Sequence, residues 1–344
     1  MRMQHGLLAL LLLCACQAPA TPPRAALGGL GQGARAVAPR GAALPAAPQA
    51  MLAPQVSLAP QASLAPQATP ALRRATELPY ATADRPDEVS GYQLHFVYAI
   101  PQDGKDDLLD VNGVIELSAN ALNAWLEAQS GRRLRLDTYE GRLDVTFVQL
   151  PYLAAEISGT HLAVSDLIEN WLKTQTGVQP TKLYVVYYDG VFATPEGFCG
   201  LAPLPPGGLG QTAILLLRGY NPTVDVSCPR SFTRSADYTG FFETAILHEV
   251  LHLLGLVAEC APHVDGGHVT DNTQDLMYFR YDGSFSPLYM TLDYHQDDYF
   301  NHGQPNCPDL ARSIFLEPLP AHAELPPRWG DSIRNVPPNP LEPK

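Results

Sequence analysis

The sequence lacks a hydrophobic stretch long enough to cross a membrane, and it carries little positive charge. The apolar run at residues 7–13 is far too short for a spanning helix, and nowhere do about 18 apolar residues follow one another. The 344 residues include 22 lysines and arginines against 35 acidic residues, which gives a net charge of −13. Residues 1–85 hold seven arginines against two acids (+5), so the rest of the chain carries −18. A body this acidic repels polyanions, and we expect no nucleic-acid partner.

Proline is scarce in the middle of the chain and frequent towards both ends. Of 33 prolines, 12 lie in residues 17–87 and eight in residues 318–344, which leaves 13 for the 230 residues between. Residues 53–70 repeat a six-residue Ala-Pro-Gln unit without aromatic side chains, so they cannot bury enough surface to fold. We therefore expect a disordered Pro/Ala-rich tether at 17–87, one folded domain at 88–317 and a Pro-rich tail at 318–344.

The first 16 residues have the features of an export signal. Arg2 precedes the short apolar run, which has the length of a signal-peptide core rather than of a membrane anchor. The run ends in Leu13-Cys14-Ala15-Cys16, which resembles the bacterial lipobox and implies that Cys16 is lipidated and becomes the mature N-terminus. The alternative is an ordinary cleaved signal with incidental cysteines. We expect an exported protein, outside the cytoplasm, that is attached to a bacterial membrane or cell surface only through this lipid.

The segment between the proline-rich ends alternates strand-like and helix-like patterns. Four β-rich runs lie at residues 92–100, 143–150, 183–188 and 212–217. Apolar residues recur at helical spacing in residues 113–129 and 164–175, and each pattern stops before a glycine. This order predicts an α/β to α+β domain built on a twisted, mixed sheet.

A further helix is predicted after the last strand, over residues 241–255. Thr239 or Ser235 can cap its start, and Gly255 can end it. Its residues are apolar almost all round, so we expect the helix to be buried and its few polar side chains to need partners.

The polar side chains of this helix have the spacing of a metal site. His248 and His252 are four residues apart, so both imidazoles leave one face of the helix and can bind one cation. Glu249 lies about 100° around the helix from His248, where it does not compete for the cation but can take the proton of an attacking water. The pattern therefore predicts a hydrolytic metal centre with Glu249 as general base.

The HExxHxxG motif at residues 248–255 resembles the active-site helix of the metzincin zinc peptidases. The DLMY segment at residues 275–278 resembles their Met-turn, in which the methionine, here Met277, forms an apolar floor beneath the metal ligands. The resemblance implies a metzincin-like (zincin) domain with one catalytic Zn²⁺, an active-site helix and an irregular C-terminal subdomain.

The third metal ligand departs from the metzincin pattern, because Ala258 stands where that family places a histidine or an aspartate. A catalytic zinc that keeps one position open needs three protein ligands. The residues that follow are similar to a longer loop of some secreted bacterial metzincin-like proteins, which implies a ligand from residues 266–271. We favour His268, because imidazole is the commoner third ligand beside two histidines, and keep His263 and Asp271 as alternatives.

Four cysteines lie in the predicted domain, and no two of them have the CxxC spacing of a cysteine metal site. An even number in an exported domain predicts two disulfides, with three possible pairings. We favour Cys199–Cys228 and Cys260–Cys307, because each pair closes one loop flanking the metal-binding helix.

Two other groups of polar residues invite a functional interpretation. Asp293, Asp297 and Asp298 could bind Ca²⁺, but they lack the spacing of a known calcium loop, and we expect a solvated acidic turn. The sequence therefore does not support Ca²⁺ as a cofactor. His95 lies within a strand pattern, and we expect a packed histidine rather than a ligand.

These features together predict a zinc-dependent endopeptidase that acts as a monomer on protein or peptide substrates. Glu249 would take the proton of water and pass it to the leaving amine. Tyr278 or Tyr281 could donate a hydrogen bond to the tetrahedral oxyanion, and packing as core aromatic residues is the alternative. Two other functions stay open: a non-catalytic surface binding module on an inherited metzincin frame, and a zinc hydrolase of a non-peptide amide or ester.

Overall fold

The computed structural model describes most of the chain beyond residue 80. The described segments are residues 81–158, 164–175, 178–193, 198–203, 210–222, 225–229, 231–279 and 287–326. The predicted signal peptide with Cys16, the first part of the predicted tether, Tyr281 and the tail from residue 327 lie outside them. Within the described segments, no helix has the length and apolar character needed to span a bilayer.

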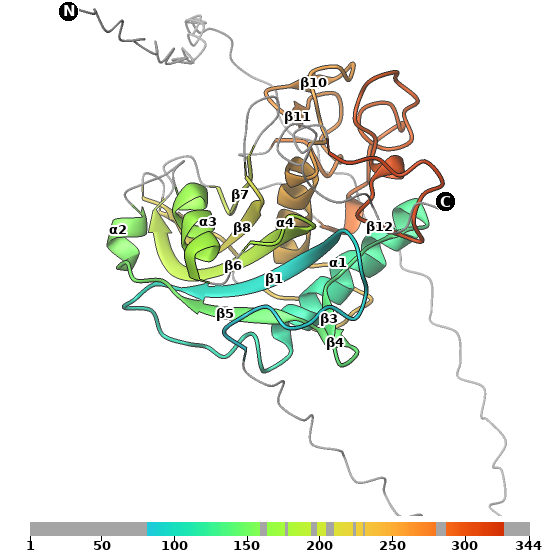
Figure 1. The fold of residues 1–344 in the computed structure, drawn as a ribbon. Coiled ribbons are helices and arrows are strands. Elements are labelled where there is room, and N and C mark those ends of the chain that lie inside the picture. Colours follow the sequence, from blue (N-terminus) through green and yellow to red (C-terminus); the bar gives the residue numbers. More distant parts are fainter. Residues whose placement is uncertain are drawn as a thin grey trace, which may run out of the picture. The chain divides into compact units, whose positions relative to one another are not determined.

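A twisted, mostly parallel sheet forms the centre of the folded body (Figure 1). Its parallel strands, in spatial order, are β5 (Val145–Gln149), β1 (Gln93–Ile100), β6 (Lys182–Ala193) and β8 (Thr212–Asn221). Two short strands pair antiparallel with β8, namely β7 (Gly200–Leu201) and β9 (Val226–Ser227). Because both directions occur, the sheet is mixed, as the sequence predicted.

Helices cover both faces of this sheet and bury two separate hydrophobic clusters (Figure 1). One face packs against α1 (Val114–Ser130) and α4 (Phe241–Leu253), and the other against α2 (Ala154–Ser158) and α3 (Val164–Gln175). Successive residues of β1 alternate between the clusters: Phe96 and Tyr98 face α1 and α4, whereas Val97 faces the other side. The sheet thus lies between two layers of helices. Its strands are buried on both faces, and their sequences are therefore near-continuous apolar runs.

The remainder of the body is short, irregular structure, much of it after α4. The small strands are β2 (Arg133–Leu134), β3 (Thr138–Tyr139), β4 (Arg142–Leu143), β10 (Val264–Asp265), β11 (His268–Val269) and β12 (Leu316–Glu317), and two 3₁₀ turns span Pro287–Tyr289 and Leu310–Arg312. β10 and β11 form a hairpin whose two central glycines have positive φ angles. β12 pairs with β2 and so attaches the C-terminal part to the main body.

Element boundaries differ from the predictions at a few positions. The predicted strand at 143–150 is divided between β4 and β5, and the strand predicted to end at 217 continues to Asn221. Helix α4 begins at Phe241 as predicted, but its N-cap is Gly240 rather than Thr239 or Ser235. The carboxylate of Glu243 accepts a hydrogen bond from the Gly240 N–H at 2.9 Å and thereby satisfies the helix start without a hydroxyl cap. Gly255 has a φ of 75° and ends the helix as predicted.

The folded body extends beyond both predicted boundaries. At the N-terminal side, residues 81–87, which the sequence assigned to the tether, contact the sheet: Phe147 N–H donates to the Ala81 carbonyl at 2.7 Å. At the C-terminal side, the Ile314 N–H donates to the Glu324 carbonyl at 3.0 Å, so residues 318–326 also lie against the body. Composition missed both extensions because backbone hydrogen bonds and charges hold these residues, together with only a few apolar side chains such as Leu319 and Ala323.

A buried charge network holds residues 84–87 in place. The Lys182 ammonium group is fully buried and donates hydrogen bonds to Asp84 at 2.7 Å, Asp87 at 2.7 Å and Asp137 at 2.6 Å. Burial alone would lower the pKa of Lys182, but the hydrogen bonds to these carboxylates outweigh it and raise the pKa above its usual value. His95 lies beside them, with Nδ1 2.7 Å from Asp137 and Nε2 2.9 Å from the Thr146 hydroxyl, which is the packed position expected for it.

Candidate metal centre

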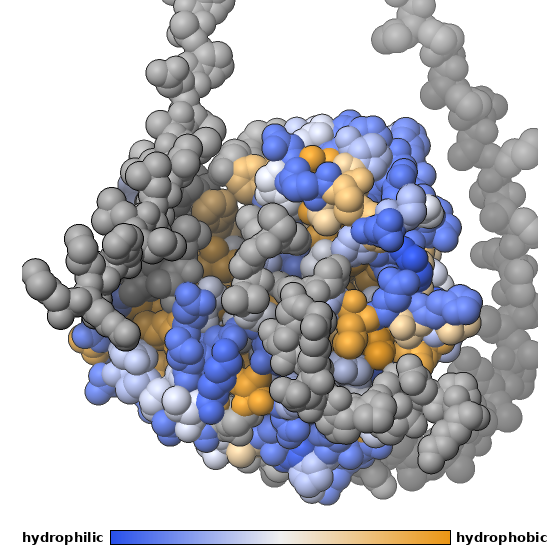
Figure 2. Space-filling model, turned by 45° about the horizontal axis from the view of Figure 1, so that its top comes forward, coloured by the Kyte–Doolittle hydropathy of each residue, from blue (hydrophilic) through white to orange (hydrophobic). Residues whose placement is uncertain are grey.

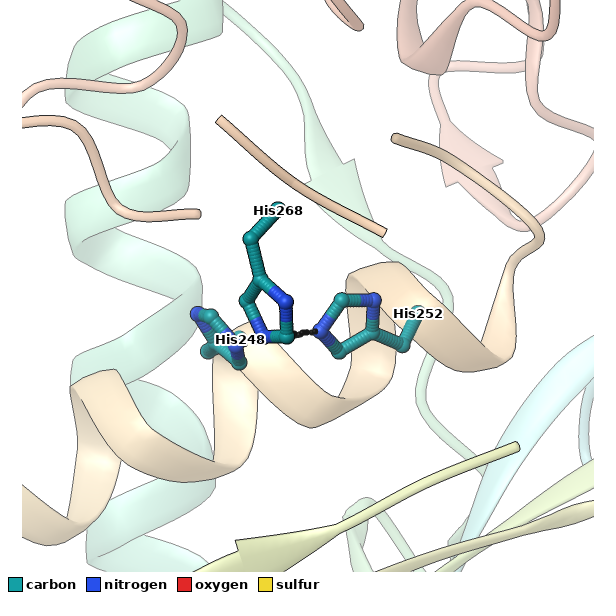
Figure 3. A group of neighbouring side chains, drawn as sticks. All are labelled: His248, His252 and His268. Atoms are coloured by element: carbon teal, nitrogen blue, oxygen red, sulfur yellow. Dashed lines mark hydrogen bonds between the residues drawn. The ribbon is translucent and has the colours of Figure 1, made fainter. Parts of the chain in front are cut away.

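Three histidine side chains converge where α4 meets the β10–β11 hairpin (Figure 3). His248 and His252 lie one turn apart on α4, and His268 comes from the first position of β11. The Nε2 atom of His252 is 3.0 Å from Nε2 of His248 and 3.3 Å from Nε2 of His268. The structure therefore brings together the two helix histidines and the favoured third residue.

The distances between these nitrogens fit a tetrahedral zinc ion. At zinc–nitrogen bonds of 2.0–2.1 Å, two nitrogens of a tetrahedral site lie about 3.3 Å apart. The observed separations of 3.0 and 3.3 Å match that spacing. Three imidazoles also form the donor set of a catalytic zinc site with one open position. The residues present thus fit the metal that the sequence implies.

The hydrogen bonds of the His248 and His268 rings leave Nε2 of each ring unprotonated. Nδ1 of His248 donates to the Leu276 carbonyl at 2.7 Å, and Nδ1 of His268 lies 3.2 Å from the Gly266 carbonyl. A carbonyl can only accept, so the proton is on Nδ1 and the lone pair is on Nε2. Burial, together with the neighbouring His268, lowers the pKa of His248 to about 4, and burial lowers the pKa of His268 as well. Both rings are therefore neutral at physiological pH, which is the form that binds a metal.

Glu249 is held against the edge strand β7. A β-carbon built on Gly200 would lie only 2.5 Å from Cγ and 2.6 Å from Oε1 of Glu249, so a side chain at this position would clash with the glutamate. The Glu249 side chain therefore occupies space beside β7 that is free only because residue 200 is a glycine. Burial raises the pKa of Glu249 to about 8 in the absence of a cation.

The segment 275–278 forms a buried turn next to the histidines. Met277 is fully buried, and its N–H donates to Oδ1 of Asp275 at 2.7 Å. Asp275 also accepts hydrogen bonds from the Tyr294 N–H at 2.7 Å and the Tyr299 hydroxyl at 2.9 Å. Burial raises the pKa of Asp275 to about 7, although these donors oppose the shift. Asp275 therefore joins the turn to residues 294–299. The sequence did not predict this role, because it depends on residues far along the chain.

The hairpin that presents His268 is fixed to the same turn. The Val269 N–H donates to the Met277 carbonyl at 3.0 Å, and Val269 and Tyr278 form an isolated parallel bridge. The ring of His268 also contacts Phe279, with a centroid separation of 4.7 Å. Tyr278 is half-buried, and its predicted role as an oxyanion donor stays a prediction.

Two disulfides flank the site, in the pairing that the sequence favoured. Cys199–Cys228 lies directly before Gly200 and joins the start of β7 to the segment after β9. Cys260–Cys307 joins the segment between α4 and the hairpin to the C-terminal part. Each disulfide therefore fixes a loop that reaches the histidine cluster or Glu249.

The other candidate ligands are not part of this cluster. His263 and Asp271 lie at the two ends of the hairpin and face Asp297 and Asp298 instead. The predicted solvated acidic turn at residues 293–298 is wrong for two of its members, because Asp293 and Asp298 are buried. The backbone of this turn folds around the Asp293 carboxylate and so carries both side chains inward.

Among the residues that Figure 2 colours by hydropathy, hydrophilic ones predominate, and apolar patches lie between them. This distribution fits the acidic composition of the body.

Three solved structures resemble this chain distantly. No protein-family model and no curated protein sequence matches this chain. Wild-type OgpA from Akkermansia muciniphila is similar at a TM-score of 0.32 and 18% identity, over 65% of this chain and 62% of OgpA. The catalytically inactive OgpA in complex with an O-glycopeptide (glycodrosocin) is similar at a TM-score of 0.27 and 15% identity, over 53% of this chain and 52% of that chain.

Metalloproteinase-II from Bacteroides fragilis gives a TM-score of 0.30 and 19% identity, over 65% of this chain and 56% of that protein. The chain therefore spans less than two thirds of the length of these proteins. Likenesses of this size carry no conclusion about function.

Proposed function

We propose that this protein is a metzincin-like, zinc-dependent endopeptidase. The observation that carries the proposal is the convergence of His248, His252 and His268 at zinc-ligand spacing, with Glu249 directly beside the first ligand. A purely structural metal site has no need of a carboxylate in that position. The residues therefore favour hydrolysis over simple metal binding.

The roles of the residues follow from their chemistry. Zinc, when bound, supplies Lewis acidity that activates water and polarises the substrate carbonyl. His248, His252 and His268 would hold the ion through Nε2, and the carbonyls of Leu276 and Gly266 orient two of these rings. Glu249 would take the proton from the attacking water and deliver it to the leaving nitrogen of the peptide bond. Met277, fully buried next to the His268 hairpin, would support the ligands from below.

The location of the enzyme forms part of the same proposal. Two disulfides are typical of proteins that fold in an oxidising, extracytoplasmic compartment. Together with the predicted export signal they support a secreted hydrolase. Lipidation at Cys16, which lies outside the described residues, stays a prediction.

Metal removal tests the proposed activity directly. We expect a chelator to abolish cleavage of casein by the full chain and Zn²⁺ to restore it. His268→Ala should not recover at the same zinc concentration, because loss of a ligand should weaken zinc binding beyond the ~10–100-fold caused by loss of outer-shell partners. His322→Ala, at an exposed position, is the matched control and should behave like wild type. Cleavage that persists in metal-free protein would contradict the proposal.

Gly200→Ala should lower activity through Glu249 alone. The added methyl group needs the space of the glutamate side chain, and a displacement of about 1 Å in a catalytic group can cost about 100-fold in rate. We expect casein cleavage to fall by this order while the zinc content stays unchanged. The clash should also destabilise the fold by about 1–3 kcal/mol in urea unfolding. In the Glu249→Ala background this destabilisation should disappear, and a cost that persists there would refute the contact.

A further inference from the structure

A second group of metal-ligating side chains lies at the base of the β10–β11 hairpin. His263 and Asp271 flank the hairpin, and Asp297 and Asp298 come from the turn at residues 293–298. Nδ1 of His263 is 3.4 Å from Oδ2 of Asp298, 3.6 Å from Oδ2 of Asp297 and 3.8 Å from Oδ2 of Asp271. One ligand atom from each of the four residues lies within 4.8 Å of the others. The group is thus compact enough to surround a single ion.

Three buried side-chain atoms of this group have no hydrogen-bond partner. The Asp298 side chain is completely buried, and its Oδ1 accepts the His263 N–H at 2.9 Å, but Oδ2 has no hydrogen-bond partner. The same holds for Nδ1 of His263 and Oδ1 of Asp297, which are also buried atoms. Buried polar atoms are nearly always satisfied, because leaving one without a partner costs about 1–3 kcal/mol. Two of these atoms, Nδ1 of His263 and Oδ2 of Asp298, lie 3.4 Å apart without a hydrogen bond, which indicates that a ligand completes the site.

The charge of the group points to a cation. It contains three carboxylates, and among the residues that the structure describes no lysine or arginine lies within 4 Å of them. The network around Lys182 shows the contrast, since there three carboxylates share one buried ammonium group. Carboxylates in such proximity repel one another unless a positive charge lies between them.

The protein backbone holds the four ligands in place independently of an ion. The carboxylate of Asp293 accepts backbone N–H groups from Asp297, Asp298 and Tyr299, which fixes the turn that carries two of the ligands. On the hairpin side, the N–H and the hydroxyl of Thr270 both donate to the His263 carbonyl, at 2.9 and 2.8 Å. The site is therefore preformed rather than assembled from mobile side chains.

We propose that His263, Asp271, Asp297 and Asp298 form a second zinc site, separate from the three-histidine centre. The imidazole favours zinc over calcium, because calcium takes oxygen ligands whereas zinc accepts both imidazole nitrogen and carboxylate oxygen. An ion in this position joins the hairpin that presents His268 to the turn at residues 293–298. The site does not depend on the proposed peptidase activity.

Zinc stoichiometry tests this second site. The full-length protein is stripped with a chelator, reloaded with excess Zn²⁺, desalted into metal-free buffer and measured by inductively coupled plasma mass spectrometry. We expect two zinc ions per wild-type chain and one per chain in Asp298→Asn. This substitution keeps the oxygen that accepts the His263 N–H and replaces the inward oxygen by an amide that cannot bind a cation. Asp265→Asn, on the exposed side of the same hairpin, is the matched control and should retain two.

A ligand variant of the first site separates the two proposals. His252→Ala should hold one zinc ion, and His252→Ala combined with Asp298→Asn should hold none. One ion in wild type and none in His252→Ala would overturn the second site and leave the peptidase proposal standing. One ion that survives His252→Ala but not Asp298→Asn would support the second site and overturn the three-histidine centre. Equal zinc content in wild type and Asp298→Asn would also overturn the second site.

Discussion

Glu249→Gln should abolish casein cleavage while leaving the zinc content of the protein unchanged. The glutamine has nearly the same size and can occupy the same space beside Gly200, but it cannot accept a proton from water. General acid–base groups contribute about 10²–10⁴-fold to enzymatic rates, so kcat should fall by at least two orders of magnitude. The measurement is the initial rate of casein cleavage at matched zinc occupancy, with zinc determined on the same samples.

Glu259→Gln is the control for this substitution, because Glu259 is exposed in the segment that follows α4. It should retain the wild-type rate. If Glu249→Gln cleaves casein as fast as wild type at equal zinc content, Glu249 is not the general base. If neither protein cleaves casein although both hold zinc, the alternatives of a binding module or a hydrolase of non-peptide substrates gain support.

Lys182→Met should destabilise the fold strongly, because it breaks a buried ion-pair network on the N-terminal side of the body. The methionine fills a similar volume but leaves Asp84, Asp87 and Asp137 without their shared cation, and Asp137 is fully buried. Removing one partner of a buried ion pair typically costs about 3–5 kcal/mol, because the remaining charge stays buried. The free energy of unfolding in urea, measured with both disulfides intact, should fall by this amount.

Two further variants test the cause of that loss. Lys105→Met removes an exposed ion pair with Asp107 and should change stability by less than about 1 kcal/mol. Asp137→Asn in the Lys182→Met background removes the most deeply buried of the uncompensated charges and should restore part of the stability. A Lys182→Met protein as stable as Lys105→Met would show that the network does not support the fold.

The secondary structure could be predicted from the sequence wherever its signal is local. Helix α3 occupies Val164–Gln175 as its apolar spacing indicated, and β1 differs from its predicted bounds by a single residue. The start of α4 at Phe241 was predicted, but its N-cap was missed, because the Glu243 carboxylate accepts the Gly240 N–H and such a cap has no hydroxyl to reveal it. The extent of β6 and β8 was underestimated because pairing with a neighbouring strand continues past the apolar run.

The parts of the candidate site that lie close together in the sequence could be predicted, whereas contacts between distant segments could not. His248, Glu249 and His252 follow from helix geometry, and His268 followed from ligand chemistry and a family resemblance rather than from spacing. The contact between Gly200 and Glu249 could not be inferred, because it depends on where an edge strand lies in the folded sheet. The pairing of His263 with Asp298 across two loops likewise requires the fold, so these residues were recognised as separate candidate ligands but not as members of one site.

The Lys182 network has a mechanical consequence for a protein held by its N-terminus. The proposed lipid anchor and the residues after it would transmit any pull from the cell surface to residues 84–87. Those residues are fastened to the sheet by Lys182 and by Arg85, which binds Asp144 at 2.7 Å. None of these residues belongs to the histidine cluster or to the second group of ligands. A pull on the N-terminal residues would therefore act first on the sheet, and the positions of the three histidines would depend little on it.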